Sequence, residues 1–234
     1  MTDAYIAYTH RFFRKWLPVY DGFALSIAWV YRAAVELAEP APGRTILDLC
    51  TGTGEVAIRL ARRGARVIAV DVTPDMLERA RAKAARKAAG LPIDWRLGDA
   101  RSLDLADLSV DAVTVSFALH DMPRPARLGV LREALRVTRN RLVILDYDLV
   151  PSWLGRAQTR AIASFETAYF PRFAEEGVEP LLAELGLAPA FACRLVPGCF
   201  EVWVVRVDAG SETDSDDPHA DPDADSDATA EGAR

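Results

Sequence analysis

Three aspartates, each placed at the end of a short apolar segment, are the residues of this chain best suited to bind a ligand. Asp48 lies within the segment 46–49, Asp71 follows 66–70, and Asp99 follows Gly98. A carboxylate at the end of a strand can accept hydrogen bonds from both hydroxyls of a ribose, and carboxylates attract cations. No basic residue stands in the glycine turn beside them, so these acids predict a cationic nucleoside without phosphates.

A glycine-rich turn follows the first aspartate. Residues 50–54 carry Gly52 and Gly54, and residues 56–61 have the apolar spacing of a helix. Glycines let the backbone approach a ligand closely, and the start of a helix offers unpaired N–H groups. Strand, glycine turn and helix in this order are typical of a nucleotide-binding site.

His120 is the histidine closest to this predicted site, and its ring titrates near neutral pH. It suits a base that removes a proton from an acceptor, or a structural group that binds Asp121 or a backbone carbonyl. Asp146 and Asp148 end the fifth predicted strand, where they would pair with an amine substrate or be solvated. Cys50, inside the glycine turn, is interpreted as a packing residue.

Regular alternation of strands and helices defines the fold class. We expect strands at 45–49, 66–70, 93–97, 112–116 and 142–145, and helices at 55–63, 73–89 and 125–137. This period predicts a doubly wound α/β sheet of parallel strands joined by right-handed crossovers.

The pattern changes after Pro151. Residues 152–170 and 178–185 are predicted to be helical, and strands at 191–196 and 200–207 flank the turn signal at 197–198. A connection this short makes the last two strands an antiparallel hairpin. The aromatic residues of the first of these helices would either form a wall over an apolar acceptor or pack in the core: Phe165, Tyr169 and Phe170.

Two helices are expected before the first strand, within residues 1–40. Residues 4–17 combine aromatic and basic side chains at helical spacing, Pro18 is expected to end that helix, and a second one is expected at 23–38. The pair would pack outside the sheet or cover a substrate site as a lid. Residues 4–17 would also suit contact with a membrane surface.

Composition places the remaining residues, 41–207, in one domain. The chain has 234 residues, half of them apolar, and a net charge of −6. Residues 208–234 hold ten acidic residues and one arginine, so the rest of the chain carries +3, and this acidic tail is predicted to be disordered. The three cysteines form no C-x-x-C pair, and no apolar run is long enough to span a bilayer. We therefore expect a cytoplasmic protein without a metal site.

Four segments, in order, resemble the class I S-adenosylmethionine-dependent methyltransferases: residues 47–55, 70–77, 98–100 and 111–116. The resemblance covers about 20–207. With Tyr20-Asp21-Gly22-Phe23 ahead of them, they are most similar to the ubiquinone/menaquinone C-methyltransferase branch. That branch typically has an Arg-Asn pair where this chain carries residues 119–123, a departure in the half that binds the acceptor. The aromatic and basic helix at 4–17 favours a small acceptor of apolar, quinone-like or lipid-like character.

The resemblance implies a Rossmann-like sheet of seven strands, in the order 3-2-1-4-5-7-6 with strand 7 antiparallel. It also implies an enzyme that uses S-adenosylmethionine. The backbone around Cys50, Gly52 and Gly54 would hold the methionine part, with Asp48 attracting the positive charge. The remaining implied contacts are Asp71 to the ribose, Val72 and Met76 flanking the adenine, Asp99 and Ala100 at its amino edge, and Ser116 and Phe117 beneath the sulfonium.

Other functions remain open at this point. An NAD(P)-dependent oxidoreductase would share the glycine turn, but the chain lacks a Tyr-x-x-x-Lys pair to catalyse hydride transfer. A methyltransferase-like binding protein without activity would look the same in sequence. A nucleic-acid methyltransferase is disfavoured, because the fourth strand is not followed by the Asn/Asp-Pro-Pro-Tyr/Phe motif, so we expect no nucleic-acid partner.

Overall fold

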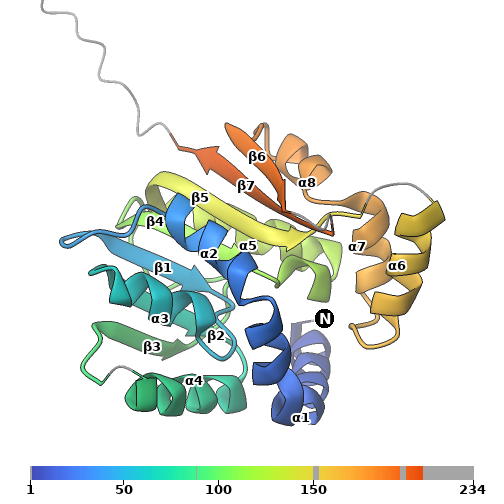
Figure 1. The fold of residues 1–234 in the computed structure, drawn as a ribbon. Helices are drawn as coiled ribbons and strands as arrows, with labels where there is room; N and C mark the ends of the chain where they lie inside the picture. The colour runs from blue at the N-terminus through green and yellow to red at the C-terminus, as the bar shows by residue number, and fades with distance from the viewer. Residues whose placement is uncertain (1, 88, 150–152, 196–198, 208–234) are drawn as a thin grey trace, which may run out of the picture.

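A seven-stranded sheet forms the centre of the molecule. The computed structural model describes residues 2–87, 89–149, 153–195 and 199–207. The strand order is β3-β2-β1-β4-β5-β7-β6, and β7 is antiparallel to both neighbours while the others run parallel, as predicted (Figure 1). The strands are β1 (Thr45–Leu49), β2 (Arg66–Asp71), β3 (Ile93–Leu97), β4 (Val110–Ser116), β5 (Thr138–Tyr147), β6 (Phe191–Leu195) and β7 (Phe200–Arg206).

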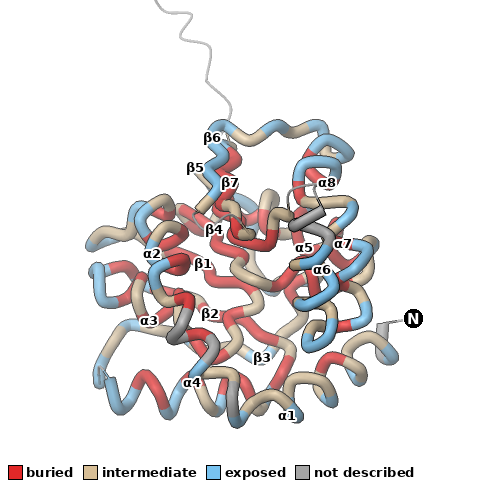
Figure 2. The backbone as a smooth tube through the Cα atoms, turned by 45° about the vertical axis from the view of Figure 1, so that its right-hand side comes forward, coloured by how far each residue is buried: buried red, intermediate tan, exposed pale blue. Residues whose placement is uncertain are grey.

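The central strands are buried on both faces because helices cover the sheet on each side (Figures 1 and 2). Strands buried in this way carry apolar runs, which here are Ile46-Leu47 of β1 and Leu142–Leu145 of β5. α2 (Ala28–Leu37) and α3 (Glu55–Arg62) pack against each other on one face, and α5 (Arg124–Val137) lies behind it. The remaining helices are α1 (Thr2–Ser26), α4 (Pro74–Lys87), α6 (Trp153–Ala163), α7 (Phe170–Glu176), α8 (Glu179–Glu184) and the short 3₁₀ helix η1 (Leu119–Asp121).

The first helix is longer than the sequence predicted. Pro18 lies inside α1, and the chain breaks between α1 and α2 only at Ile27, so the predicted end at Pro18 is wrong. Pro18 is exposed. A proline removes one hydrogen bond from a helix, and water can satisfy the freed carbonyl on an exposed face. α1 therefore continues past the proline and reaches across the mouth of the sheet, with a bend that Figures 1 and 2 show.

The helix predicted at 152–170 is also wrong in its extent. α6 ends at Ala163, a connection follows, and Phe170 begins the separate helix α7. In the sequence, the aromatic residues keep helical spacing from α6 through to α7, so the connection between the two helices was not predicted. The predicted turn at 197–198 and the acidic tail lie outside the described residues. No helix in the described part of the chain is long and apolar enough to cross a membrane.

Candidate active site

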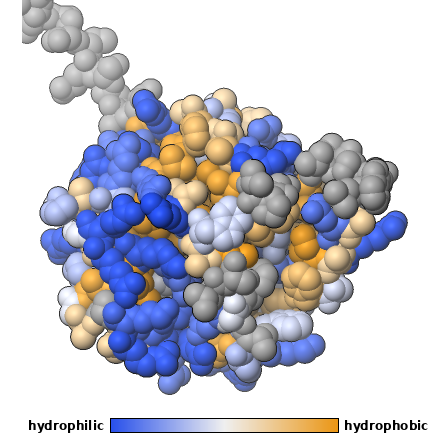
Figure 3. Space-filling model, in the orientation of Figure 1, coloured by the Kyte–Doolittle hydropathy of each residue, from blue (hydrophilic) through white to orange (hydrophobic). Residues whose placement is uncertain are grey.

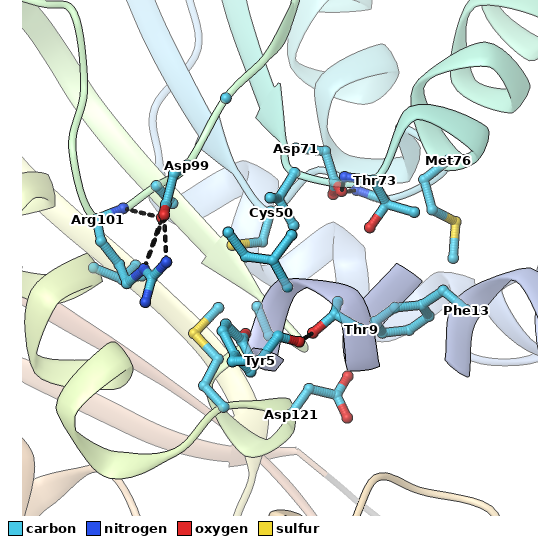
Figure 4. Close-up of a pocket in the computed structure, with 18 of the residues that line it drawn as sticks. Tyr5, Thr9, Phe13, Cys50, Asp71, Thr73, Met76, Asp99, Arg101 and Asp121 are labelled. Atoms are coloured by element: carbon cyan, nitrogen blue, oxygen red, sulfur yellow. Dashed lines mark hydrogen bonds and ion pairs between the residues drawn. The ribbon is translucent and has the colours of Figure 1, made fainter. Parts of the chain in front are cut away.

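A pocket lies at the carboxyl ends of the parallel strands, where sheets of this type bind ligands. The glycine turn after β1, the ends of β2 and β4 and the loop after β3 form its walls, and α1 forms its roof (Figure 4). Eight of the eleven residues predicted to bind a cofactor line it: Cys50, Gly52, Asp71, Val72, Met76, Asp99, Ala100 and Phe117. We call this cavity the cofactor pocket.

Asp71 is held in place by the backbone on both sides of it. Its Oδ2 accepts a hydrogen bond from the N–H of Gly52 at 2.7 Å, and its Oδ1 accepts one from the N–H of Thr73 at 2.8 Å. Burial raises the pKa of this carboxyl, and the two N–H donors oppose that effect. A carboxylate oxygen has more than one acceptor position, so Asp71 keeps the capacity to bind two ribose hydroxyls.

The two glycines of the turn have different roles. Gly52 has a φ of +54°, and a Cβ there would lie 3.5 Å from the hydroxyl of Tyr20, in the space between the turn and α1. Gly54 has a φ of +78°, and its Cβ would come within 2.7 Å of the ring of Trp95. Gly54 does not line the pocket and packs at the start of α3, and its contact with the cofactor stays a prediction.

Backbone strain occurs at two other residues of the pocket wall. Cys50 and Phe117 follow β1 and β4 directly, and both have positive φ angles, of 55° and 50°. Side-chain-bearing residues reach this region at a cost of about 1–3 kcal/mol, and such residues cluster where a ligand is bound. Both residues line the cofactor pocket.

Asp48 and Ser116 do not line the cofactor pocket itself but a small cavity that continues from it past Cys50 and Tyr20, with a volume of about 20 Å³. Asp48 accepts hydrogen bonds from the hydroxyls of Thr51 at 2.6 Å and Thr114 at 2.7 Å, and burial raises its pKa to about 6. Ser116 Oγ is buried and has no hydrogen-bond partner among the described residues. These groups fit the charged amino-acid end of S-adenosylmethionine.

Asp99 has a basic partner, contrary to the prediction that the acids stand alone. Arg101 Nε lies 2.8 Å from Asp99 Oδ1, and this ion pair holds the pKa of Asp99 below its usual range (Figure 4). The guanidinium also lies 5.5 Å from the centre of the Tyr5 ring on α1. The sequence did not predict this ion pair, because it depends on how the turn after β3 folds the Arg101 side chain back onto Asp99.

α1 is fastened at several points over the pocket. His10 Nε2 lies 2.8 Å from the carbonyl oxygen of Val72, and Arg14 forms an ion pair with Asp75. Towards the other side, the hydroxyl of Tyr8 accepts a hydrogen bond from the N–H of Ala168 at 3.0 Å. The free volume is about 60 Å³, well below the roughly 300 Å³ or more that ligand pockets usually offer. The cofactor pocket is therefore narrow in this structure.

A buried lysine secures the other half of α1. Lys83 on α4 lies 2.6 Å from Asp21 of α1 and 2.9 Å from Glu55 of α3, and it donates a hydrogen bond to Thr53 at 2.7 Å. Burial alone would raise the pKa of Asp21, but the hydrogen bonds from Lys83 and Arg79 outweigh it and lower the value to about 2. This cluster joins the glycine turn to the roof.

A second, mainly apolar cavity adjoins the first, with a volume of about 370 Å³. Four residues belong to the walls of both: Phe13, Tyr20, Phe117 and Asp121. The others come from α1, α2, η1, the end of β5 and the connection after α6: Phe12, Trp16, Tyr31, His120, Tyr147, Phe165 and Glu166. We call this cavity the aromatic pocket.

His120 lies at one wall of the aromatic pocket and is 3% exposed. Its Nδ1 donates to Asp146 Oδ1 at 2.7 Å, and its Nε2 lies 3.4 Å from both Asp121 Oδ2 and Glu166 Oε2. Burial alone would lower the pKa of the ring, but Asp121, Asp146 and Glu166 together raise it well above its ordinary value. Burial raises the pKa of Asp121 to about 7, and the carboxylates of Glu166 and Asp146 add to that effect.

Asp146, within β5, and Asp148, just after it, line neither pocket, and their contact with an amine substrate stays a prediction. Asp146 is fully buried, and besides His120 its oxygens accept hydrogen bonds from the N–H groups of Leu119 and Tyr147. It orients the imidazole. Asp148 forms an ion pair with Arg194 of β6 and lines neither pocket.

Glu166 was missed by the sequence analysis. It lies in the connection between α6 and α7, and its Oε1 accepts a hydrogen bond from the Tyr147 hydroxyl at 2.8 Å. Its neighbour Phe165 lines the aromatic pocket and is 41% exposed, while Phe170 is fully buried beside His120 and Tyr147. Of the three aromatic residues predicted to line a wall or pack in the core, Phe165 lines the aromatic pocket and Phe170 packs in the core. Tyr169 packs against Tyr5 and Tyr8 of α1.

Comparison with known proteins agrees with this geometry. Residues 46–141 match the family described as a methyltransferase domain. The chain is 33% identical over 124 residues to the ubiquinone/menaquinone biosynthesis C-methyltransferase of Roseobacter denitrificans, covering 51% of this chain and 49% of that protein. It is 39% identical over 149 residues to the demethylmenaquinone methyltransferase of Thermus thermophilus, covering 59% and 66%. The chain spans about half the length of most curated relatives it matches.

Solved structures show the same fold. Magnesium protoporphyrin IX methyltransferase from Synechocystis with bound S-adenosylhomocysteine aligns with a TM-score of 0.61 at 17% identity, covering 86% of this chain and 99% of that one. A methyltransferase from Haloferax volcanii, in complex with its activator, aligns with a TM-score of 0.67 at 17% identity, covering 86% and 98%. Fold, site and relatives together place this chain in the class I S-adenosylmethionine-dependent methyltransferases, near the ubiquinone/menaquinone branch.

Proposed function

We propose that this protein transfers the methyl group of S-adenosylmethionine to a small, largely apolar acceptor held in the aromatic pocket. The observation that carries the proposal is the shared wall of the two cavities, made by Phe13, Tyr20, Phe117 and Asp121. A donor in the cofactor pocket and an acceptor in the aromatic pocket would meet at that wall. The names of the two curated relatives support a quinone-like acceptor.

The cofactor would lie along the strand ends. Asp71 would bind the ribose, Val72 and Met76 would flank the adenine, and Asp99 and Ala100 would lie at its amino edge. Asp48 and Ser116 would bind the amino-acid end of the cofactor. The buried Oγ of Ser116, which has no hydrogen-bond partner among the described residues, would form a hydrogen bond there. The bound cofactor supplies an activated methyl group, so the main contribution of the protein is to align donor and acceptor.

An acceptor that loses a proton on methylation would do so beside His120. The sequence predicts this residue as the base, and its Nε2 lies at the wall of the aromatic pocket with Asp121 and Glu166. Asp146 fixes the ring orientation through Nδ1, which leaves Nε2 directed to the carboxylates and the pocket. The base role of His120 stays a prediction.

α1 would act as a lid over both pockets. The cofactor pocket is narrow, and Tyr5, Thr9 and Phe13 of α1 lie against the cofactor-binding turns (Figure 4). We expect α1 to move outward when a nucleoside enters. Phe12 and Trp16 on the same helix border the aromatic pocket, beside the basic residues Arg14 and Lys15. This combination supports contact of residues 4–17 with a membrane surface from which an apolar acceptor would enter.

The distribution of surface residues is consistent with that route. In Figure 3 hydrophobic side chains gather towards the side where α1 and α6 lie, whereas the side over α3 is largely hydrophilic. Phe165, at the edge of the aromatic pocket, is among the most exposed large apolar side chains of the described residues.

Methyl transfer can be tested with labelled cofactor. The full chain is incubated with methyl-labelled S-adenosylmethionine and either 1,4-naphthohydroquinone or an organic extract of cells. We expect label in an organic-soluble product that mass spectrometry then identifies. The Asp71→Asn variant is the control that should lose transfer. Label found only in water-soluble amines or in protein would contradict the apolar acceptor.

A further inference from the structure

We propose that His120, Asp121 and Glu166 form a binding site for one divalent first-row transition-metal ion, such as Mn²⁺ or Zn²⁺, at the wall of the aromatic pocket. This site goes beyond the proposed methyl transfer and relies on it only for the identity of the acceptor. The sequence predicted no metal site, because these three ligands come from two distant segments and form no cysteine or histidine motif.

The three side chains have the right spacing for a common ion. One ligand atom from each lies within 4.8 Å of the other two, and His120 Nε2 is 3.4 Å from an oxygen of each carboxylate. Two ligands bound at about 2.1 Å in tetrahedral geometry are about 3.4 Å apart. An ion would thus fit between them with little movement of the side chains.

An unsatisfied polar atom points to a missing partner at the same place. Asp121 is 6% exposed, yet its Oδ1 has no hydrogen-bond partner among the described residues. Leaving a buried carboxylate oxygen unpaired costs free energy, and a bound cation removes that cost. The carboxylates of Asp121, Asp146 and Glu166 meet here around a single imidazole.

The groups behind the three ligands are those that metal sites use. Asp146 accepts the Nδ1 proton of His120, which turns the lone pair of Nε2 towards the proposed ion, and Tyr147 donates its hydroxyl to Glu166. A carboxylate behind a histidine ligand fixes the tautomer and the ring orientation. These contacts leave one oxygen of Glu166 and the Nε2 of His120 facing each other.

The site is also open on one side. All three ligands line the aromatic pocket, and Asp121 belongs to the cofactor pocket as well. Three protein ligands with one open position are typical of catalytic rather than structural metal sites. An oxygen of the acceptor could take the open position, which would hold the acceptor at the wall shared with the methyl donor. With the ion bound, Nε2 of His120 is a ligand and cannot be the base predicted from the sequence.

Binding of Mn²⁺ alone provides the test. The full chain is freed of metal with a chelator, and Mn²⁺ is titrated while the electron paramagnetic resonance signal of the free ion is followed. We expect one ion per chain, with the affinity reduced tenfold or more in Glu166→Gln and Asp121→Asn. Zn²⁺ should displace the bound Mn²⁺. Glu36→Gln, an exposed glutamate on α2, is the matched control and should bind as the wild type does.

S-Adenosylhomocysteine binding is measured on the same samples. Glu166→Gln keeps the size of the side chain and the acceptor for Tyr147, so it should retain this binding and show that the variant is folded. A wild-type chain that binds S-adenosylhomocysteine but takes up no Mn²⁺ would overturn the metal site and leave methyl transfer standing. Equal Mn²⁺ binding in all variants would also overturn the site, because the ion would then lie elsewhere.

Discussion

Individual carboxylates in this protein differ because of what surrounds them. Asp71 keeps capacity for a ligand beside two backbone N–H donors, Asp99 is paired with Arg101, and Asp146 is fully occupied in holding His120. Sequence position alone placed all three at strand ends. Only the structure distinguishes Asp71, which keeps acceptor capacity towards the pocket, from Asp99 and Asp146, which bind neighbouring side chains.

Replacement of Asp71 by asparagine should weaken cofactor binding. One acceptor oxygen becomes an amide that cannot accept from a ribose hydroxyl, and the loss of a charged hydrogen bond costs about 1.5–3 kcal/mol. We expect the dissociation constant for S-adenosylhomocysteine to rise by about ten- to a hundredfold, measured by titration calorimetry. Asp94→Asn, an exposed aspartate on β3, is the control. Unchanged affinity in Asp71→Asn would contradict the assigned ribose contact.

Asp48 should make stability depend on pH. Burial raises its pKa from 3.8 to about 6 in the folded protein, so the fold favours the protonated carboxyl. Its contribution to stability is therefore present at low pH and is lost as the pH rises from about 4 through 6. Between pH 4 and pH 8 the loss amounts to about 2 kcal/mol.

The Asp48→Asn variant isolates this contribution. It cannot ionise, so the difference in free energy of unfolding between variant and wild type should shift by about 2 kcal/mol in favour of the variant between pH 4 and pH 8. Denaturant unfolding of the cofactor-free chain at both pH values measures it. A difference that does not change with pH would mean that Asp48 keeps an ordinary pKa.

At the scale of elements, the sheet was predictable and the helices around its mouth were not. Short apolar runs in the sequence predict the parallel strands. The family resemblance carried by the four motifs implies the order of the strands in the sheet. The length of α1 was harder to predict. A proline usually ends a helix, but Pro18 is exposed and lies inside α1. Glu166 could not be found either, since nothing local shows that the connection after α6 folds back onto His120.

The contacts of α1 predict how fast the cofactor leaves. His10→Ala combined with Arg14→Ala removes the contact with Val72 and the ion pair with Asp75. We expect S-adenosylhomocysteine to dissociate several-fold faster, with little change in thermal stability because both groups lie near the surface. Stopped-flow displacement of a fluorescent cofactor analogue measures the rate. An unchanged rate would show that α1 does not gate the cofactor pocket.

At the scale of the whole molecule, function depends on segments far apart in the chain meeting at one edge of the sheet. Within one turn of α1, His10 contacts the loop after β2 and Tyr8 contacts the connection after α6. Farther along the helix, Phe13 and Tyr20 line both pockets. The predicted cofactor contacts come from short motifs within residues 46–141, and eight of those eleven residues line the cofactor pocket. The acceptor half draws on α1, β5 and the α6–α7 connection, which have no such motifs.

Titration calorimetry of the full chain with S-adenosylhomocysteine, and separately with NADH, tests the cofactor assignment most directly. It requires no knowledge of the acceptor, and both ligands suit a glycine turn with an acid at the end of β2. We expect one molecule of S-adenosylhomocysteine per chain with micromolar affinity, and no heat from NADH. Binding of NADH without binding of S-adenosylhomocysteine would contradict the methyl-transfer function.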